Sequence, residues 1–305
     1  MLLYKYKGLI LKRENEDIEL EQENKNLEFK KKNFFTLDPL EKKYLYFSRP
    51  SELNDPFDCN IQISFDATDK EYLQWIKTNR KKIIPGYKLS TVAGIKKAIK
   101  ESDFIERFSK TSKELIENNH VLSLTTDCMN ESMWALYANN YNGICIGYNF
   151  NDSNFSFVPC KIEFSGKKTY EYFSENLKPI IFEEIFYDNK GENPLYIFKT
   201  DTNQKSNILY NLTHKKECWA NENEYRAIIH DTDFFNMPND CCTTKVFYED
   251  SFLSEIIFGY KTPSELINYI IELVQKDYTN QIKFYKIFPN LTDFKLEKQL
   301  LEIQS

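Results

Sequence analysis

The chain has 305 residues, a formal net charge of −6, 41% hydrophobic residues and 28% charged residues. These proportions are typical of a folded protein and exclude an intrinsically disordered chain. Only eight glycines occur, which argues against Gly-rich repeats and against a phosphate-binding glycine loop. Since no apolar run is long enough to cross a membrane and the start lacks a secretory h-region, we expect a cytoplasmic protein with no membrane partner.

The seven cysteines are irregularly spaced and include no C-x-x-C pair. This pattern is typical of reduced thiols and argues against a disulfide framework or a zinc finger. Three histidines are the only imidazoles that could add metal ligands. We therefore expect no metal centre.

Short strands and helices alternate in the first half of the chain. A strand is predicted at 2–10 and another at 44–48, where the following Arg-Pro pair ends it. A helical insertion is predicted over about 68–119, beginning with a Thr-Asp cap. The next predicted elements are a strand at 121–125, a short helix near 132–138 and a strand at 143–150.

The second half of the chain is predicted to begin with helices and then to become β-rich. A second helical segment is expected over about 168–216. No linker or repeat divides the chain, so we expect a single α+β domain over residues 1–305. The later predicted elements are strands at 224–230, 243–248, 254–259 and 281–294, and a helix that begins near 262–265.

The stretch Glu222-Asn-Glu224-Tyr-Arg226 is the most informative for chemistry. If it enters a strand, the two-residue period places its three charges on one face. Three neighbouring charges are costly to bury unpaired, so they face water or line a polar cleft. One interpretation is a solvated edge with a weak ion pair. The other is a carboxylate pair that stabilises a ribosyl oxocarbenium ion and activates a nucleophile.

A second candidate is the segment 44–58, in which an Asn-Asp-Pro triplet is a strong turn signal. The turn either closes a strand or presents Asn54 and Asp55 to a ligand, because rigid loops commonly carry recognition groups. Tyr46 and Ser48 lie on the preceding strand.

The strand-helix-strand unit at 121–150 supplies a third candidate. Ser123 and Thr125 share a strand face and would offer hydroxyl groups to an open cleft. Trp134 and Tyr137 lie at helical spacing, which more often indicates core packing than a ligand site.

The first strand carries Tyr4 and Tyr6 on one face and Lys5 on the other. Either an aromatic pair or a cation is therefore available for a site. Trp219, just before the glutamate pair, is a further stacking candidate.

Taken in order, these segments resemble DUF2971, a bacterial family known only as a domain of unknown function. The motifs that carry the resemblance are the initial YKY, YFSRPSELNDPFD, MWALYANNYNG and ENEYRAII. The resemblance covers essentially the whole chain. Because the family has no assigned activity, it implies no chemistry by itself.

The order of the motifs is also similar, more loosely, to that of mono-ADP-ribosyltransferases. Those enzymes combine a first strand with Arg, His or Tyr, a middle strand with hydroxyl residues and a late strand with Glu, often as Glu-x-Glu. The matching segments here are 4–6, 123–125 and 222–224. Two departures are a Lys or Tyr where Arg or His is usual, and Ser-Leu-Thr in place of Ser-Thr-Ser. The resemblance implies two small, mostly antiparallel sheets that form a cleft for NAD.

This second resemblance implies transfer of ADP-ribose from NAD to a nucleic acid or a protein. It also implies a toxin or antiphage effector, which an antitoxin or another regulatory partner would control. Glu224 would stabilise the developing positive charge, and Glu222 would act as general base. The implied NAD-binding residues are Tyr4, Lys5, Tyr6, Tyr46, Ser48, Asn54, Asp55, Ser123, Thr125, Trp134, Tyr137 and Arg226.

Two alternatives belong to other classes of protein. One is a nuclease that binds Mg²⁺ through Asp55, Asp58, Glu222 and Glu224, since carboxylate oxygens are the ligands that this ion prefers. The other is a binding module without catalysis.

Overall fold

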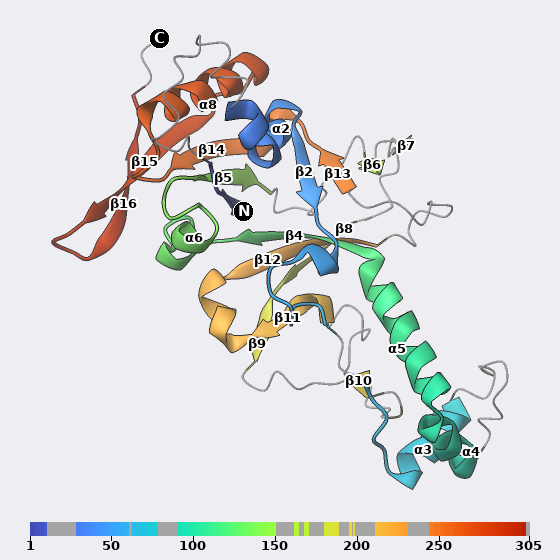
Figure 1. The fold of residues 1–305 in the computed structure, drawn as a ribbon. Helices are drawn as coiled ribbons and strands as arrows, with labels where there is room; N and C mark the ends of the chain where they lie inside the picture. The colour runs from blue at the N-terminus through green and yellow to red at the C-terminus, as the bar shows by residue number, and fades with distance from the viewer. Residues whose placement is uncertain are drawn as a thin grey trace.

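An eight-stranded sheet forms the centre of the computed structural model (Figure 1). The strand order is β16-β15-β14-β5-β1-β4-β12-β8, and all neighbours are antiparallel except β14 and β15. The structure describes residues 1–10, 29–60, 63–78, 91–150, 162–164, 168–170, 180–188, 195–196, 198, 211–230 and 244–302. The strands are β1 (Leu2–Lys7), β4 (Asn119–Thr125), β5 (Ile144–Asn149), β8 (Ile180–Glu184), β12 (Glu224–His230), β14 (Leu253–Phe258), β15 (Lys283–Asn290) and β16 (Lys295–Leu300).

Three smaller sheets accompany the central one. An antiparallel sheet has the order β2-β13-β6-β7, and a bridge between Ser48 and Val121 connects it to β4. Two parallel strand pairs are β10-β3 and β11-β9. The bounds are β2 (Tyr44–Phe47), β3 (Ile63–Ser64), β6 (Ile162–Phe164), β7 (Lys168–Tyr170), β9 (Phe186–Asp188), β10 (Leu195–Tyr196), β11 (His214–Lys216) and β13 (Thr244–Phe247).

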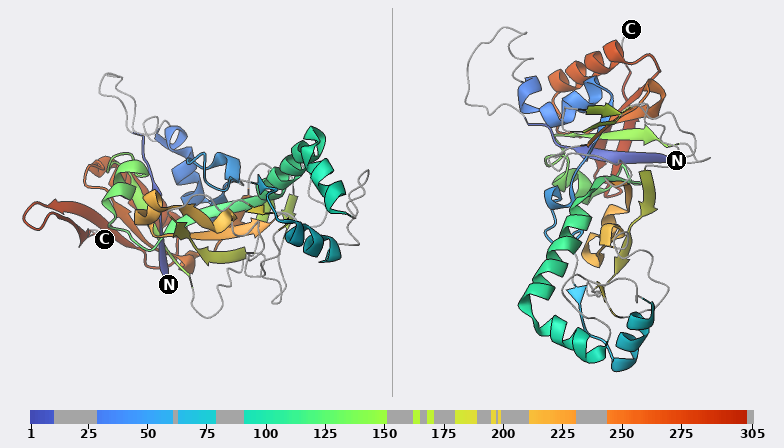
Figure 2. Two further views of the ribbon diagram at one scale, coloured as in Figure 1. Left: turned by 90° about the horizontal axis from the view of Figure 1, so that it is seen from below. Right: turned by 90° about the vertical axis from the view of Figure 1, so that its right-hand side faces the viewer.

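Helices α2 (Phe34–Glu41) and α8 (Ser264–Asp277) cover one face of the central sheet (Figures 1 and 2). In α8 the buried residues Ile267, Ile270, Ile271 and Val274 recur at helical spacing, so one stripe of the helix is apolar. Each such side chain contributes about 1.5–3 kcal/mol when it is fully buried. This stripe joins the largest core cluster of the described residues.

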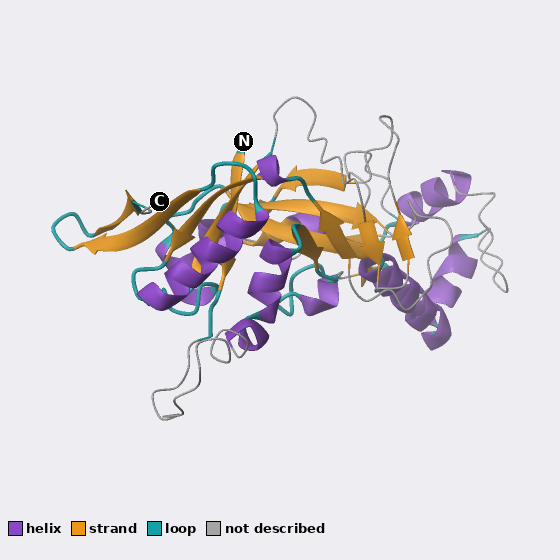
Figure 3. Cartoon of the chain, turned by 90° about the horizontal axis from the view of Figure 1, so that it is seen from above, coloured by secondary structure: helices purple, strands orange, loops and turns teal. Residues whose placement is uncertain are grey.

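The other face carries α6 (Glu131–Leu136) and the 3₁₀ helix η2 (Glu217–Glu222). Helix α5 (Ser102–Glu117) leads away from the central sheet. Helices α3 (Asp69–Thr78) and α4 (Val92–Lys100) lie at the end of α5 that is remote from the sheet (Figures 1 and 2). At the opposite end the β15–β16 hairpin projects beyond the helices (Figure 3). Two further 3₁₀ turns are η1 (Pro50–Glu52) and η4 (Asp250–Phe252).

Most of the predicted elements are confirmed within the described residues. They include the first strand, the helical insertion, the strand-helix-strand unit and the four late strands. The Thr68 hydroxyl accepts a hydrogen bond from the Glu71 N–H, which confirms the predicted cap of α3. None of the described helices has both the length and the apolar character needed to cross a membrane.

The second helical segment, predicted over about 168–216, is wrong in most of the part that the structure describes. That part contains five strands, β7 to β11, and only residues 211–213 are helical. Strand β8 contains Ile-Ile-Phe, a run of β-branched and aromatic residues that suits a strand. It forms because it pairs with β12 at five positions, an interaction that local periodicity does not reveal.

The mixed α+β class is confirmed, but the predicted pair of small sheets is not what the described strands form. The central sheet is nevertheless joined weakly at one place. β1 pairs with β5 at six positions and β4 pairs with β12 at seven, whereas β1 and β4 pair only at Tyr4 and Thr125. The sheet therefore consists of two halves, β16 to β1 and β4 to β8, that meet at a single residue pair.

Gly259 should be intolerant of a side chain, because the chain passes very close to it. Its N–H donates to the Gly143 carbonyl at 3.0 Å, and an added Cβ would overlap the Tyr141 carbonyl oxygen. We expect Gly259→Ala to lower the free energy of unfolding by about 1–3 kcal/mol through overpacking. Urea denaturation measures this, with the exposed Thr292→Ala as control. An unchanged midpoint for Gly259→Ala would contradict the packing described.

Candidate functional site

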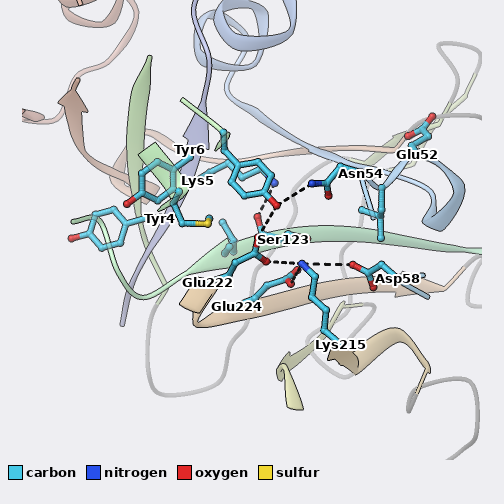
Figure 4. A pocket seen from close by; sticks show the side chains of 14 residues that line it. Tyr4, Lys5, Tyr6, Glu52, Asn54, Asp58, Ser123, Lys215, Glu222 and Glu224 are labelled. Carbon is cyan, nitrogen blue, oxygen red and sulfur yellow. Dashed lines mark hydrogen bonds and ion pairs between the residues drawn. The ribbon is translucent and has the colours of Figure 1, made fainter. Parts of the chain in front are cut away.

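A pocket of about 230 Å³ lies beside the junction of β1 and β4 (Figure 4). Its walls come from both halves of the sheet, and from α6, β11, η2 and the loop that follows β2. Side chains from seven places in the sequence therefore meet there. The lining residues are Tyr4, Lys5, Tyr6, Glu52, Leu53, Asn54, Asp58, Ser123, Leu124, Met133, Tyr137, Lys215, Glu222 and Glu224.

Lys215 is a buried cation at the floor of this pocket. Its Nζ lies 2.5 Å from Glu222 Oε2, 3.1 Å from Glu224 Oε2 and 3.8 Å from Asp58 Oδ2. One ammonium thus bridges three carboxylates that would otherwise repel one another (Figure 4). Such an arrangement fixes the carboxylates in place, since each is oriented by a charge-assisted hydrogen bond or an ion pair.

Arg226 supports two of these carboxylates, Asp58 and Glu224, from behind the pocket. Its guanidinium is completely buried and binds both oxygens of Asp58, at 2.9 and 2.5 Å. It also donates to Glu224, with Nε 2.8 Å from Oε1 and Nη2 3.2 Å from Oε2. The interpretation of this stretch as a solvated edge is therefore wrong, because its charges are buried and paired.

Glu224 remains ionised despite its burial. Burial by itself raises the pKa of a carboxyl group, but the charges of Arg226 and Lys215 outweigh it and lower the pKa of Glu224 to about 2. Burial would likewise lower the pKa of Lys215, yet Glu224 and Glu222 raise it above its ordinary value. At neutral pH the pocket therefore contains an anionic Glu224 and a cationic Lys215.

Asn54, Tyr137 and Glu222 form a hydrogen-bonded chain across the pocket. Asn54 Nδ2 donates to the Tyr137 hydroxyl at 3.0 Å, and that hydroxyl donates to Glu222 Oε1 at 2.6 Å. Burial and the neighbouring Glu222 raise the pKa of Tyr137, so it stays a donor at neutral pH. These two hydrogen bonds therefore connect three motifs that are far apart in the sequence.

Glu222 reaches the pocket by a different route from the one predicted. It ends η2 and is not part of β12, so the two-residue period applies only to Glu224 and Arg226. Asn223 between them has φ 44° and ψ 50°, the left-handed conformation that Asn tolerates well. This turn returns Glu222 to the side of Glu224, and the Thr125 hydroxyl holds the Glu222 carbonyl at 2.6 Å.

Lys5 enters the pocket from β1 and donates to the Ser123 carbonyl at 2.7 Å. Burial, followed by the nearby charge of Lys7, lowers the pKa of Lys5 to about 7. The rings of Tyr4 and Tyr6 also line the pocket, but their hydroxyls donate to Glu255 and to the Asp127 carbonyl.

The structure does not bring every predicted site residue to this pocket. Trp134 is completely buried, packs edge-on against Tyr6 and donates to the Cys128 carbonyl, so it belongs to the core. Arg226 and Thr125 lie behind the lining residues as supports. Tyr46 is bonded to Glu52, Ser48 forms the bridge to β4, and Asp55 accepts from the Phe57 N–H as part of a turn.

Sequence reasoning missed Lys215 entirely and assigned Asp58 only to the nuclease alternative. Lys215 lies in a Thr-His-Lys-Lys run that is typical of a surface. The one available signal was indirect, because a buried carboxylate pair needs a buried cation. Trp219, the further stacking candidate, has its ring centroid 5.1 Å from the Lys215 Nζ.

The described residues offer no group of three His, Cys, Asp or Glu side chains that could hold a metal ion. The carboxylates of Asp58, Glu222 and Glu224 are already paired with the side chains of Lys215 and Arg226, which take the place of a metal ion. The nuclease alternative therefore gains no support from the geometry.

Residues 133–227, about a third of the chain, match the family described as Protein of unknown function (DUF2971). The first resemblance is confirmed over this range, and its extension to the rest of the chain stays a prediction. This range contains Tyr137, Lys215, Glu222, Glu224 and Arg226. No curated protein and no solved structure matches the chain.

Removal of Arg226 should be strongly destabilising. Arg226→Met would leave the buried Asp58 and Glu224 with Lys215 as their only cationic partner among the described residues, and breaking a buried pair in this way costs about 3–5 kcal/mol. The control is Lys295→Met, since Lys295 and Asp293 form an exposed ion pair that contributes at most about 1 kcal/mol. Urea denaturation of both variants measures the difference, and equal losses would contradict the network.

The lowered pKa of Glu224 predicts a loss of stability in acid. Its folded pKa of about 2 lies below its ordinary value of 4.5, so its contribution is complete above pH 4.5 and disappears as the pH falls toward 2. We expect Glu224→Gln to show a flatter decrease of unfolding free energy across this range. The exposed Glu265→Gln should keep the steep decrease. Denaturant midpoints measured at several pH values distinguish the two.

Proposed function

We propose that this DUF2971-related chain breaks the bond between nicotinamide and ribose in NAD and transfers the ADP-ribose to a nucleic acid or protein. The observation that carries the proposal is that Glu224, ionised at neutral pH, reaches the same pocket as the tyrosines of the first strand. Glu224 and strand β1 lie far apart in the sequence but line one pocket, as the resemblance to ADP-ribosyltransferases implies.

The arrangement of the strands supports the same proposal. The resemblance requires a first strand, a hydroxyl strand and a glutamate strand, and β1, β4 and β12 are neighbours in this order. Tyr4, Thr125 and Glu224 occupy paired positions across them. We propose that the weak junction between β1 and β4 is the cleft of an ADP-ribosyltransferase-like fold, with each half of the central sheet as one wall.

The proposed chemistry begins with departure of nicotinamide. The bond between the ribose C1′ and the ring nitrogen breaks, its electron pair goes to the nitrogen, and positive charge develops on the ribose. Glu224 faces this charge as a fixed anion, because Arg226 and Lys215 orient it before substrate binds. Preorganised charge of this kind requires no rearrangement in the transition state.

The size of the pocket indicates which part of NAD it would enclose. Its volume of about 230 Å³ is below the range of about 300–1,000 Å³ that is typical of sites for whole small molecules. We propose that nicotinamide and its ribose occupy the pocket, with Tyr4 or Tyr6 against the ring, while the adenosine half lies outside it. The hydroxyl of Ser123 would orient the ribose or the amide.

The acceptor and the biological role rest on the resemblance alone. Glu222 as general base toward the acceptor stays a prediction, and water in place of the acceptor would give NAD hydrolysis. A role as a toxin or antiphage effector under an antitoxin or regulatory partner is proposed on the same basis.

The decisive experiment incubates the purified protein with cell extract and NAD labelled in the adenylate phosphate. We expect label to enter protein or nucleic acid, and Glu224→Gln to lower the rate by about 10²–10³-fold, as for loss of one electrostatic stabiliser. Glu265→Gln, an exposed substitution of the same type in α8, should leave the rate unchanged.

Thermal melting of both variants separates a catalytic loss from unfolding. The proposal is contradicted if neither incorporation of label nor release of nicotinamide occurs. Cleavage of nucleic acid that needs Mg²⁺ but no NAD would favour the nuclease instead.

A further inference from the structure

We propose that Lys5, rather than Glu222, is the general base of this site. In this assignment its neutral amine takes the proton of the nucleophile that attacks the ribose C1′. The inference rests on the proposed function and identifies which side chain performs its second step.

The position of Lys5 suits a base that is held in place by an uncharged partner. Its Nζ donates to the main-chain carbonyl of Ser123 at 2.7 Å, and among the described residues it forms no ion pair. Lys215, in the same pocket, lies against three carboxylates. A neutral amine and an ammonium both donate to a carbonyl, so Lys5 can lose its proton without losing its anchor.

The charges around Lys5 favour the neutral amine. After burial, the largest effects are the repulsion by Lys7 on its own strand and the opposing attraction of Glu224 on β12. Lys215 on β11 and Arg226 on β12 add further repulsion. The resulting pKa of about 7 leaves a large fraction of Lys5 unprotonated at physiological pH, the condition under which a lysine acts as a base.

Glu222 is poorly placed for the same task. Its Oε2 accepts from Lys215 at 2.5 Å and its Oε1 accepts from Tyr137 at 2.6 Å. A proton on either oxygen would disrupt one of these bonds. Glu222 therefore acts as a positioning residue, which holds Tyr137 and, through it, Asn54.

The step balances without any further reactant. As the bond from C1′ to the nucleophile forms, the proton of that nucleophile moves to the Lys5 nitrogen, which becomes an ammonium. Nicotinamide has already left as a neutral molecule with the electron pair of the broken bond. Lys5 then releases the proton to solvent, and the ADP-ribosylated acceptor leaves.

The first test is the pH profile of ADP-ribose transfer from labelled NAD to the acceptor. The unaltered protein should show a rate that rises through pH 7 to a plateau. Lys5→Met and Lys5→Arg should both lose this rise, and their kcat should be lower by about 10²-fold or more, with little change in KM. Lys5→Arg keeps a donor to the Ser123 carbonyl but cannot lose its proton, so its failure would separate proton transfer from a structural role.

Four further variants sharpen this test. Lys7→Met removes a repelling cation and should move the rise to higher pH, whereas the remote, exposed Lys295→Met should leave it unchanged. Glu222→Gln should retain the rise. Added ethylamine should partly restore Lys5→Ala. A retained rise in Lys5→Met, or its loss in Glu222→Gln alone, would overturn the assignment.

The second test does not depend on NAD. Brief acetylation of the protein at a series of pH values, read by peptide mass spectrometry, measures the fraction of neutral amine at Lys5. We expect a midpoint near 7 at Lys5, well below the ordinary lysine value of 10.5, and the exposed Lys295 is read in the same digests as a reference. A midpoint for Lys5 equal to that of Lys295 would overturn the assignment even if NAD is cleaved. Absence of NAD cleavage by the unaltered protein would instead remove the proposed function, and with it this role of Lys5.

Discussion

The burial of three carboxylates in one place depends on the two cations that are buried with them. Moving one carboxylate out of water costs several kcal/mol, and the attraction of a well-oriented cation must offset this. Arg226 provides two bonds to Asp58 and two to Glu224, while Lys215 bridges the pocket side of the group. Because these residues come from a loop, β11, η2 and β12, the network also fixes how those segments meet.

The same network gives neighbouring groups opposite protonation behaviour. Glu224 has strong cationic partners and stays ionised, whereas Lys5 is half-buried, forms no ion pair among the described residues and has a pKa of about 7. Acid–base chemistry needs groups whose environments separate their pKa values in this way. Lys5 and Glu224 lie on different halves of the central sheet, and these halves pair only at Tyr4 and Thr125. The pocket lies beside this junction, so both side chains reach it.

Local patterns predicted those elements whose conformation their own residues favour. The strand at 224–230 was predicted from its β-forming residues and the helix after 262–265 from its start signal, and both form as β12 and α8. The segment 168–216 was wrongly predicted as helical, since β8 and β9 depend on distant partners, β12 and β11. Trp134 shows the same limit: its helical spacing favoured core packing without excluding a ligand site, and its burial and its contact with Tyr6 assign it to the core.

By itself, the sequence determined the α+β class, the resemblance to DUF2971 over residues 133–227, and Glu224, Asn54 and Tyr137 as candidates, because residue type and period are local properties. The tertiary structure alone decided that Lys215 joins the carboxylates, that Arg226 lies behind them and that Glu222 enters through a left-handed turn. These contacts depend on which strands pair, and the partners are separated by up to 168 residues, as for Arg226 and Asp58. A period identifies the face of a strand on which a side chain lies, but not what lies opposite it.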